Sequence, residues 1–163
     1  MLRGLIIVCL LGFGAMTPAE AQIVALGASS TAGYGVGPSQ AFPALLEAML
    51  RAKGRRMSVS NAGVSGDTTG GMLARLSGAV PPGTRIVILQ IAGNDAMKGM
   101  SPVNAQANRA EIRRQLHARG IRTIEADGLV QSALRSGLRQ PDGIHMTAEG
   151  HRRVAEQLAA SIR

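Results

Sequence analysis

An almost unbroken apolar run near the middle of the chain, residues 86–89 followed by Ile91, most constrains the fold. A run of this kind is typical of a strand buried on both faces, as in a parallel sheet covered by helices. Other short apolar runs alternate with longer stretches of helical periodicity, which predicts an α/β fold. We expect four strands, with the third in the centre of the sheet. They span residues 23–26, 57–60, 85–91 and 121–125.

Helical periodicity covers much of the remaining chain. In the first helical stretch, apolar residues recur at the spacing of one helix face, and Gly54 follows where the helix would stop. The last stretch begins at Thr147, a favourable N-cap, with Glu149 in its first turn, where the helix dipole favours an anion. Its apolar residues recur every fourth position, so it should lie flat against the sheet. We expect helices over residues 42–53, 70–76, 104–118, 129–138 and 147–162.

A chain of 163 residues suits a single domain. Residues 1–21 resemble a secretory signal, with Arg3, an apolar stretch and a small-residue cleavage pattern, so we expect a domain over 22–163 that begins at Gln22. A membrane anchor is the alternative, but the apolar stretch is shorter than the roughly 20 residues that a spanning helix needs. A lipoprotein reaction at Cys9 fits less well because Val8 precedes it. Since Cys9 is the only cysteine, the mature chain would have no disulfide.

The formal net charge of +8 comes mostly from arginines along the expected helices, which favours solvated helix faces. A nucleic-acid interface would also need aromatic stacking partners, and the chain has only Phe13, Tyr34 and Phe42. Weak attraction to an anionic membrane or cell wall fits the charge better than nucleic acid does. The three histidines and the carboxylates lack metal-ligand spacing, so the sequence predicts no metal site and no cofactor.

Polar residues follow three of the expected strands, at the point where each strand ends. Ser29 follows the first, Gly66 the second and Asn94 the third. The carboxyl ends of parallel strands meet at one edge of the sheet, so these residues should lie together. Asp142 and His145, three residues apart before the last helix, can reach the same edge as a carboxylate–imidazole pair. Taken alone, Ser29, Gly66 and Asn94 each more often serve an ordinary turn or cap, whereas the pair of Asp142 and His145 is the more specific signal.

The segments around these residues resemble the SGNH hydrolases of the GDSL esterase family, closest to the small bacterial arylesterase, thioesterase and lysophospholipase members. The resemblance covers most of the chain after residue 22. It implies Ser29, His145 and Asp142 as a catalytic triad, with an oxyanion hole from Ser29, Gly66 and Asn94. It also implies a three-layer αβα, flavodoxin-like fold. The segments that carry it are Gly27-Ala28-Ser29-Ser30, Thr31-Ala32-Gly33-Tyr34-Gly35, Ser65-Gly66-Asp67-Thr68, Gly93-Asn94-Asp95 and Asp142-Gly143-Ile144-His145.

The sequence departs from the family at three places. Ala28 stands where an aspartate is usual, and alanine cannot hold the following turn by side-chain hydrogen bonds. Ala92 stands where glycine is usual, which should cost little. Between Asn94 and Asp142 the family commonly has two more strands, whereas this chain has one clear strand. We therefore expect a shortened sheet of four strands and an open cleft.

The sequence thus predicts a secreted or periplasmic serine hydrolase that cleaves carboxylic esters through an acyl-enzyme. Thioesters, lysophospholipids and acetylated carbohydrates remain open as substrates. The main alternative is a weakly catalytic or inactive binding protein of the same fold. We expect Asp67 and Asp95 to fix loops, and His117 and His151 to serve the surface or the packing.

Overall fold

The sheet has four parallel strands. The computed structural model describes residues 23–91 and 93–162. The strands are β1 (Ile23–Gly27), β2 (Val59–Gly63), β3 (Ile86–Gln90) and β4 (Arg122–Glu125). Their order is β2-β1-β3-β4, and every neighbouring pair is parallel. The predicted α/β class and the shortened sheet, with β3 inside it, are confirmed.

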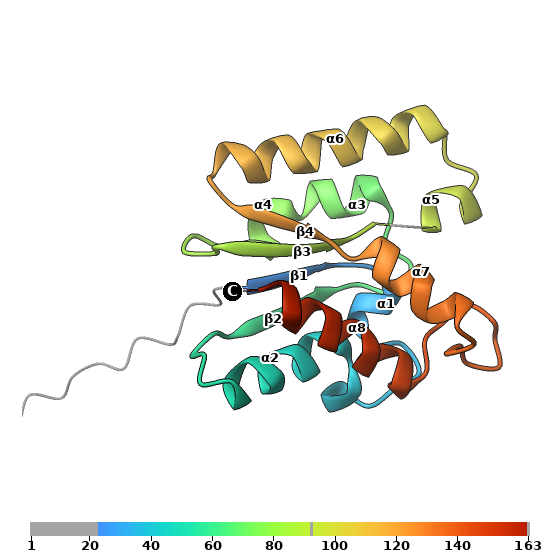
Figure 1. The fold of residues 1–163 in the computed structure, drawn as a ribbon. Coiled ribbons are helices and arrows are strands. Elements are labelled where there is room, and N and C mark those ends of the chain that lie inside the picture. Colours follow the sequence, from blue (N-terminus) through green and yellow to red (C-terminus); the bar gives the residue numbers. More distant parts are fainter. Residues whose placement is uncertain (1–22, 92, 163) are drawn as a thin grey trace, which may run out of the picture.

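Helices cover both faces of the sheet and complete three layers (Figure 1). One face carries α3 (Thr69–Ala74), α4 (Leu76–Ala79) and α6 (Pro102–Ala118). The other carries α2 (Phe42–Ala52), α7 (Asp127–Arg135) and α8 (Ala148–Ser161). The elements α1 (Ser29–Ala32), α5 (Asn94–Met97) and the 3₁₀ turn η1 (Pro38–Gln40) are single turns.

The core has two halves, one on each side of the sheet, because successive side chains of a strand point to opposite faces. Ile86 and Ile88 of β3 belong to the half formed with α2, α7 and α8. Val87 and Leu89 belong to the half formed with α3, α4 and α6. The expected helix faces hold: α2 buries Phe42, Leu46 and Leu50, and α8 buries Val154, Leu158 and the following Ile162.

Several element bounds differ from the prediction. We expected a strand over 57–60, but β2 begins at Val59 and ends at Gly63, because its pairing with β1 sets the register. As an edge strand it is only half-buried, so its polar residues do not end it. The helix expected over 70–76 is two short helices, α3 and α4, that meet at Arg75. The helix expected over 129–138 begins earlier, at Asp127, and ends at Arg135.

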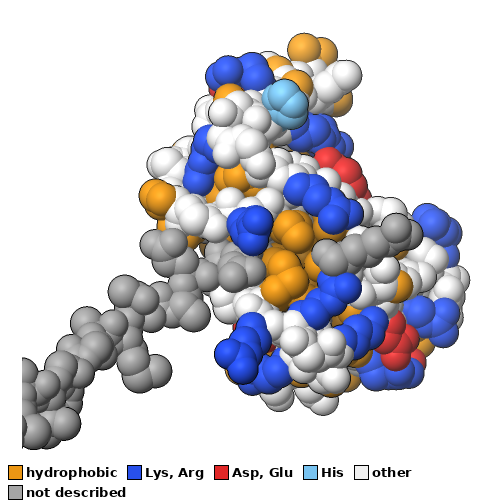
Figure 2. Space-filling model, turned by 60° about the vertical axis from the view of Figure 1, so that its left-hand side comes forward, with side chains coloured by type: hydrophobic (Ala, Val, Ile, Leu, Met, Phe, Trp, Pro, Cys, Tyr) orange, Lys and Arg blue, Asp and Glu red, His pale blue; other side chains and the backbone are white. Residues whose placement is uncertain are grey.

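Basic side chains gather at the edge of the sheet where the strands begin and where several helices have their C-termini. Figure 2 shows Lys and Arg side chains around a group of hydrophobic side chains on this side of the molecule. Lys53 and Arg55 donate to the carbonyl oxygens of Ala159 and Ile162, at the end of α8. Arg119 donates to the carbonyl oxygen of Val80, at the end of α4. Some of the basic side chains therefore donate to the unpaired carbonyl oxygens of helix C-termini, where the helix dipole favours cations.

Among residues 23–91 and 93–162, no helix has the length and apolar character needed to cross a bilayer. The signal segment predicted over residues 1–21, with Cys9 inside it, lies outside the described residues.

Candidate active site

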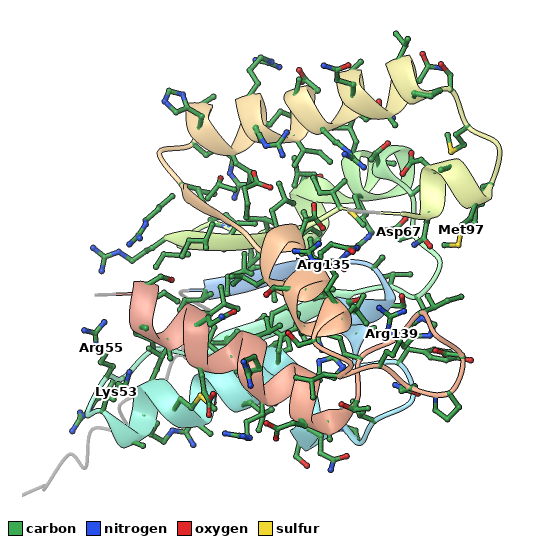
Figure 3. The ribbon with its side chains drawn as sticks, turned by 45° about the vertical axis from the view of Figure 1, so that its right-hand side comes forward. Lys53, Arg55, Asp67, Met97, Arg135 and Arg139 are labelled. Carbon is green, nitrogen blue, oxygen red and sulfur yellow. The ribbon has the colours of Figure 1, made fainter. Side chains whose placement is uncertain are left out.

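A cavity of about 460 Å³ lies at the carboxyl edge of the sheet. Ser29, Gly66, Asn94 and His145, which the sequence placed at this edge, all line it. Asp142 stands behind His145 and does not line the cavity itself. In Figure 3, Asp67 and Met97 mark this edge, on the opposite side of the molecule from Lys53 and Arg55 of the basic edge. The remaining lining residues are Ser30, Tyr34, Ser65, Gln90, Gly93, Met97, Val130, Gln131, Leu134 and Ile144.

Asp142 and His145 form a hydrogen-bonded pair. Their side chains meet at 2.7 Å between His145 Nδ1 and Asp142 Oδ2. Asp142 Oδ1 accepts from the backbone N–H groups of Ile144 and His145, at 2.9 and 3.0 Å. The His145 backbone hydrogen bond, then the His145 ring and the Ile144 N–H, lower the pKa of Asp142 to about 2. The carboxylate therefore stays ionised at neutral pH and leaves Nε2 as the ring nitrogen that is free to accept a proton.

The position of Ser29 is set by the tight turn that joins β1 to α1. The carbonyl oxygen of Ala28 accepts from the N–H groups of Thr31 and Ala32, so α1 begins at once after the strand. Gly63 of the neighbouring strand lies directly beneath α1, because a Cβ there would overlap the backbone of Thr31 and Ala32. The side chain of Ser29 is therefore presented at the end of the sheet, at the rim of the cavity.

Two further residues that line the cavity, Gly66 and Asn94, carry hydrogen-bond donors. Gly66 has φ of 77°, a conformation that L residues other than glycine rarely adopt. Asn94 begins α5, and its side-chain Nδ2 donates to the carbonyl oxygen of Asp67 at 2.7 Å. An amide nitrogen carries two protons, so the second N–H of Asn94 is left for a ligand in the cavity.

Asp67 and Asp95 fix the loops that carry these donors, as the sequence predicted. Asp67 accepts from the Arg75 guanidinium at 2.8 Å and from the Thr68 N–H at 2.9 Å. Asp95 is buried and accepts from the hydroxyl of Thr69 at 2.6 Å and from its N–H. The Asp67 carboxylate therefore holds the segment after β2 in place, and the Asp95 carboxylate ties the loop after β3 to the start of α3.

The other two histidines lie away from the site chemistry. His117 is exposed on α6. His151 is 1% exposed, and its Nδ1 accepts from the backbone N–H of Phe42 at 3.3 Å. Burial, and then the charge of His145, lower the pKa of His151 to about 4. His151 is therefore a neutral packing residue, as predicted.

Acid should destabilise the protein through His151. An unfolded histidine gains its proton near pH 6.5, whereas folded His151 gains it only near pH 4. Between these values the unfolded state binds more protons, so the free energy of unfolding should fall by up to about 3 kcal/mol as the pH drops from 7 to 4. Urea titrations across this range measure the fall, and His151→Gln should reduce it. The prediction fails if His151→Gln and the exposed-site control His117→Gln share the wild-type pH dependence.

Three residues around the site were not singled out from the sequence. The Tyr34 ring lies beside the imidazole of His145, with centroids 4.4 Å apart. Gln90 is 3% exposed at the end of β3, and Asp127 begins α7 beside it. A signal for Gln90 was present, because it is the one amide in an apolar run that should be buried on both faces.

Comparison with known proteins identifies the family. The family model "GDSL-like Lipase/Acylhydrolase family" matches residues 25–138. The chain belongs to this family. It is 34% identical to the esterase TesA of Pseudomonas aeruginosa over 107 residues. This matched stretch covers 65% of this chain and 53% of TesA. The chain spans about half the length of the curated relatives that it matches.

Solved structures of this family have the same fold. The crystal structure of TesA superposes with a TM-score of 0.78 at 24% identity, covering 86% of this chain and 97% of that one. The SGNH-hydrolase family esterase AlinE4 superposes with a TM-score of 0.60 at 31% identity, covering 89% and 74%. The fold expected from the sequence, an SGNH hydrolase fold with a short parallel sheet, is thereby confirmed.

Proposed function

We propose that this protein is a serine hydrolase that cleaves carboxylic esters through an acyl-enzyme. The observation that carries the proposal is the Asp142–His145 pair, whose imidazole lines the same cavity as Ser29, Gly66 and Asn94. A nucleophile, a base with its orienting carboxylate, and amide donors in one cavity are the groups that acyl transfer needs. Membership of the GDSL-like family and the esterase names of its relatives support the same reaction.

The reaction follows from the chemistry of these groups. Ser29 Oγ attacks the ester carbonyl carbon while His145 Nε2 takes the hydroxyl proton, and Asp142 stabilises the imidazolium. The backbone N–H groups of Ser29 and Gly66 and the Asn94 amide donate to the tetrahedral oxyanion. The bond to the alcohol oxygen then breaks as His145 returns the proton to it, which leaves the acyl group on Ser29. Water repeats the attack, releasing the carboxylic acid and restoring the serine.

The surroundings of the cavity favour an apolar, small substrate. Large hydrophobic side chains stand exposed on its walls, among them Tyr34, Met97 and Ile144. Such side chains bind acyl or aryl groups by removing apolar surface from water. Among the described residues the sheet has no strand beyond β4, and the cavity of about 460 Å³ has a size that suits a small ligand. We infer short acyl or aryl esters as the substrate class, ahead of thioesters, lysophospholipids and acetylated carbohydrates.

A series of p-nitrophenyl esters tests this substrate class. Acetate and butyrate esters should be hydrolysed with the highest kcat/KM, and the value should not rise as the acyl chain lengthens beyond the cavity. A steep preference for long acyl esters would contradict the inference. Hydrolysis of acetylated sugars at a higher kcat/KM than any p-nitrophenyl ester would favour the carbohydrate esterase instead.

Secretion to the periplasm or the medium is part of the proposal. It is supported by the signal pattern over residues 1–21, which predicts a mature chain from Gln22. Weak attachment to an anionic membrane or wall is supported by the net charge of +8. The rival function, a binding protein without turnover, draws support from Ala28 in place of the usual aspartate.

A further inference from the structure

We propose that Gln90, anchored by Asp127, is a positioning residue for the nucleophile Ser29. The inference rests on the proposed function, because it assumes that Ser29 is the nucleophile. Alanine at position 28 cannot hold the nucleophile turn by side-chain hydrogen bonds, so another group must hold it.

The side chain of Gln90 reaches the residue that precedes Ser29. Its Oε1 accepts from the backbone N–H of Ala28 at 3.1 Å and from the hydroxyl of Thr31 at 3.3 Å. These two donors flank Ser29, which is the first residue of α1: Ala28 directly follows β1, and Thr31 lies inside α1. A single oxygen atom therefore ties the end of the strand to the helix that Ser29 begins.

The backbone brings Gln90 to this place. Gly27 and Gln90 are partners at the carboxyl ends of β1 and β3. A Cβ at Gly27 would lie 2.8 Å from the Gln90 carbonyl oxygen and would overlap the Thr31 hydroxyl. The ends of β1 and β3 and the Thr31 side chain of α1 are thus closely packed around Gly27, and Gln90 acts on this turn through the Ala28 N–H and the Thr31 hydroxyl.

Asp127 fixes the other end of the amide. Its Oδ1 accepts from Gln90 Nε2 at 3.4 Å and from the backbone N–H of Ile91 at 2.9 Å. Asp127 stands in the first turn of α7, where the helix dipole favours a carboxylate. The side-chain orientation of Gln90 is therefore determined, with its oxygen toward Ala28 and its nitrogen toward Asp127.

A buried amide needs a reason, because burying it among apolar side chains costs free energy unless it is hydrogen-bonded. Gln90 projects to the same face of β3 as Ile86 and Ile88, and it is 3% exposed. An apolar residue would continue that core directly. Instead, the Gln90 amide hydrogen-bonds to the nucleophile turn. Gln90 on β3 thereby gives the turn the support that the alanine side chain at position 28 does not give.

The first test is Gln90→Met, which keeps the length of the side chain and removes the acceptor. The rate of Ser29 phosphonylation by a fluorophosphonate, and kcat for a short ester, should each fall by about 10- to 100-fold, because a displaced nucleophile loses its alignment. KM should stay within about twofold, since methionine fills the same space where Gln90 lines the cavity. Gln157→Met, at an exposed position on α8, is the matched control and should label and turn over like wild type.

A second pair of variants exchanges the two groups. Gln90→Glu alone places a carboxylate against Asp127 and should lower the labelling rate, because like charges repel at this distance. Adding Asp127→Asn removes one of the two facing charges and should raise the labelling rate above that of Gln90→Glu. This rescue also serves if Gln90→Met does not fold.

The outcomes separate the two proposals. Wild type that takes no label on Ser29 refutes the assigned nucleophile, and the inference about Gln90 is then refuted with it. Wild type that labels, beside a Gln90→Met that labels equally fast, overturns only the inference, even if its melting temperature is lower. A double variant that labels no faster than Gln90→Glu alone also counts against it.

Discussion

Replacing Ser29 by alanine should lower ester hydrolysis by a factor of about 10⁴ or more, because the acyl-enzyme can no longer form. The fold should be unchanged, since residue 29 holds the turn through its backbone carbonyl oxygen, which accepts from the N–H groups of Gly33 and Tyr34. Initial rates with p-nitrophenyl acetate, on protein with an unchanged circular dichroism spectrum and melting temperature, measure the loss.

Ser30→Ala is the sharpest control for this substitution. Ser30 is the next residue along the chain and also lines the cavity, so the two variants differ only in which hydroxyl is removed. Ser30→Ala should keep its rate within about tenfold of wild type, as a neighbour that only contacts the substrate would. If Ser30→Ala loses turnover and Ser29→Ala keeps it, the nucleophile has been assigned to the wrong serine.

Replacing Asp142 by asparagine should lower kcat by about 10³- to 10⁴-fold through the tautomer of His145. The asparagine oxygen can still accept from the backbone N–H groups of Ile144 and His145, so the loop keeps its shape. Its NH₂ group would then face His145 Nδ1 and require that nitrogen to be an acceptor. The ring proton would move to Nε2, which could no longer accept the proton of Ser29.

The pH dependence of ester hydrolysis should show no titration of Asp142 near neutral pH. Asp142 has a pKa of about 2, held low by hydrogen bonds that favour its charged form. Its charge is therefore present at all pH values well above 2 and is lost only as the pH falls toward that value. Activity at neutral pH should not depend on its titration. Initial rates from pH 4 to 9 test whether activity is independent of this titration. An Asp142→Asn variant with wild-type kcat at pH 8 would contradict the role of Asp142 in orienting His145.

The elements with strong periodicity could be predicted from the sequence, and the short ones could not. The bounds of β3 and α8 were predicted to within one residue at each end. A continuous apolar run fits only a buried strand here, and a four-residue repeat fits only a helix. The helices α1 and α5 are four residues long and carry no period. The position of β2 depends on its pairing with β1, which local composition does not contain.

The candidate site was predictable to a similar degree. The order of the segments placed Ser29, Gly66, Asn94 and His145 at one edge of the sheet, and these four residues line one cavity. The spacing of Asp142 and His145 predicted their hydrogen bond. Gln90 was missed, because a single polar residue in an apolar run identifies a buried amide but not the groups that it bonds.

Ala28 shows how the structure changes one interpretation. From the sequence, the absent aspartate put the rigidity of the nucleophile turn in doubt. In the structure Ala28 is 2% exposed and packs in the core half with Met72 and Ile91, while its backbone is held from both sides. The support of the turn therefore comes from the backbone and from Gln90.

The most direct test of the proposed function is intact-mass spectrometry after exposure to a fluorophosphonate, with wild type and Ser29→Ala treated in parallel. We predict one adduct per wild-type chain and none on the variant, because only a serine activated by a neighbouring base reacts with such a reagent. A wild-type chain that takes no adduct would contradict the esterase and favour the binding protein of the same fold.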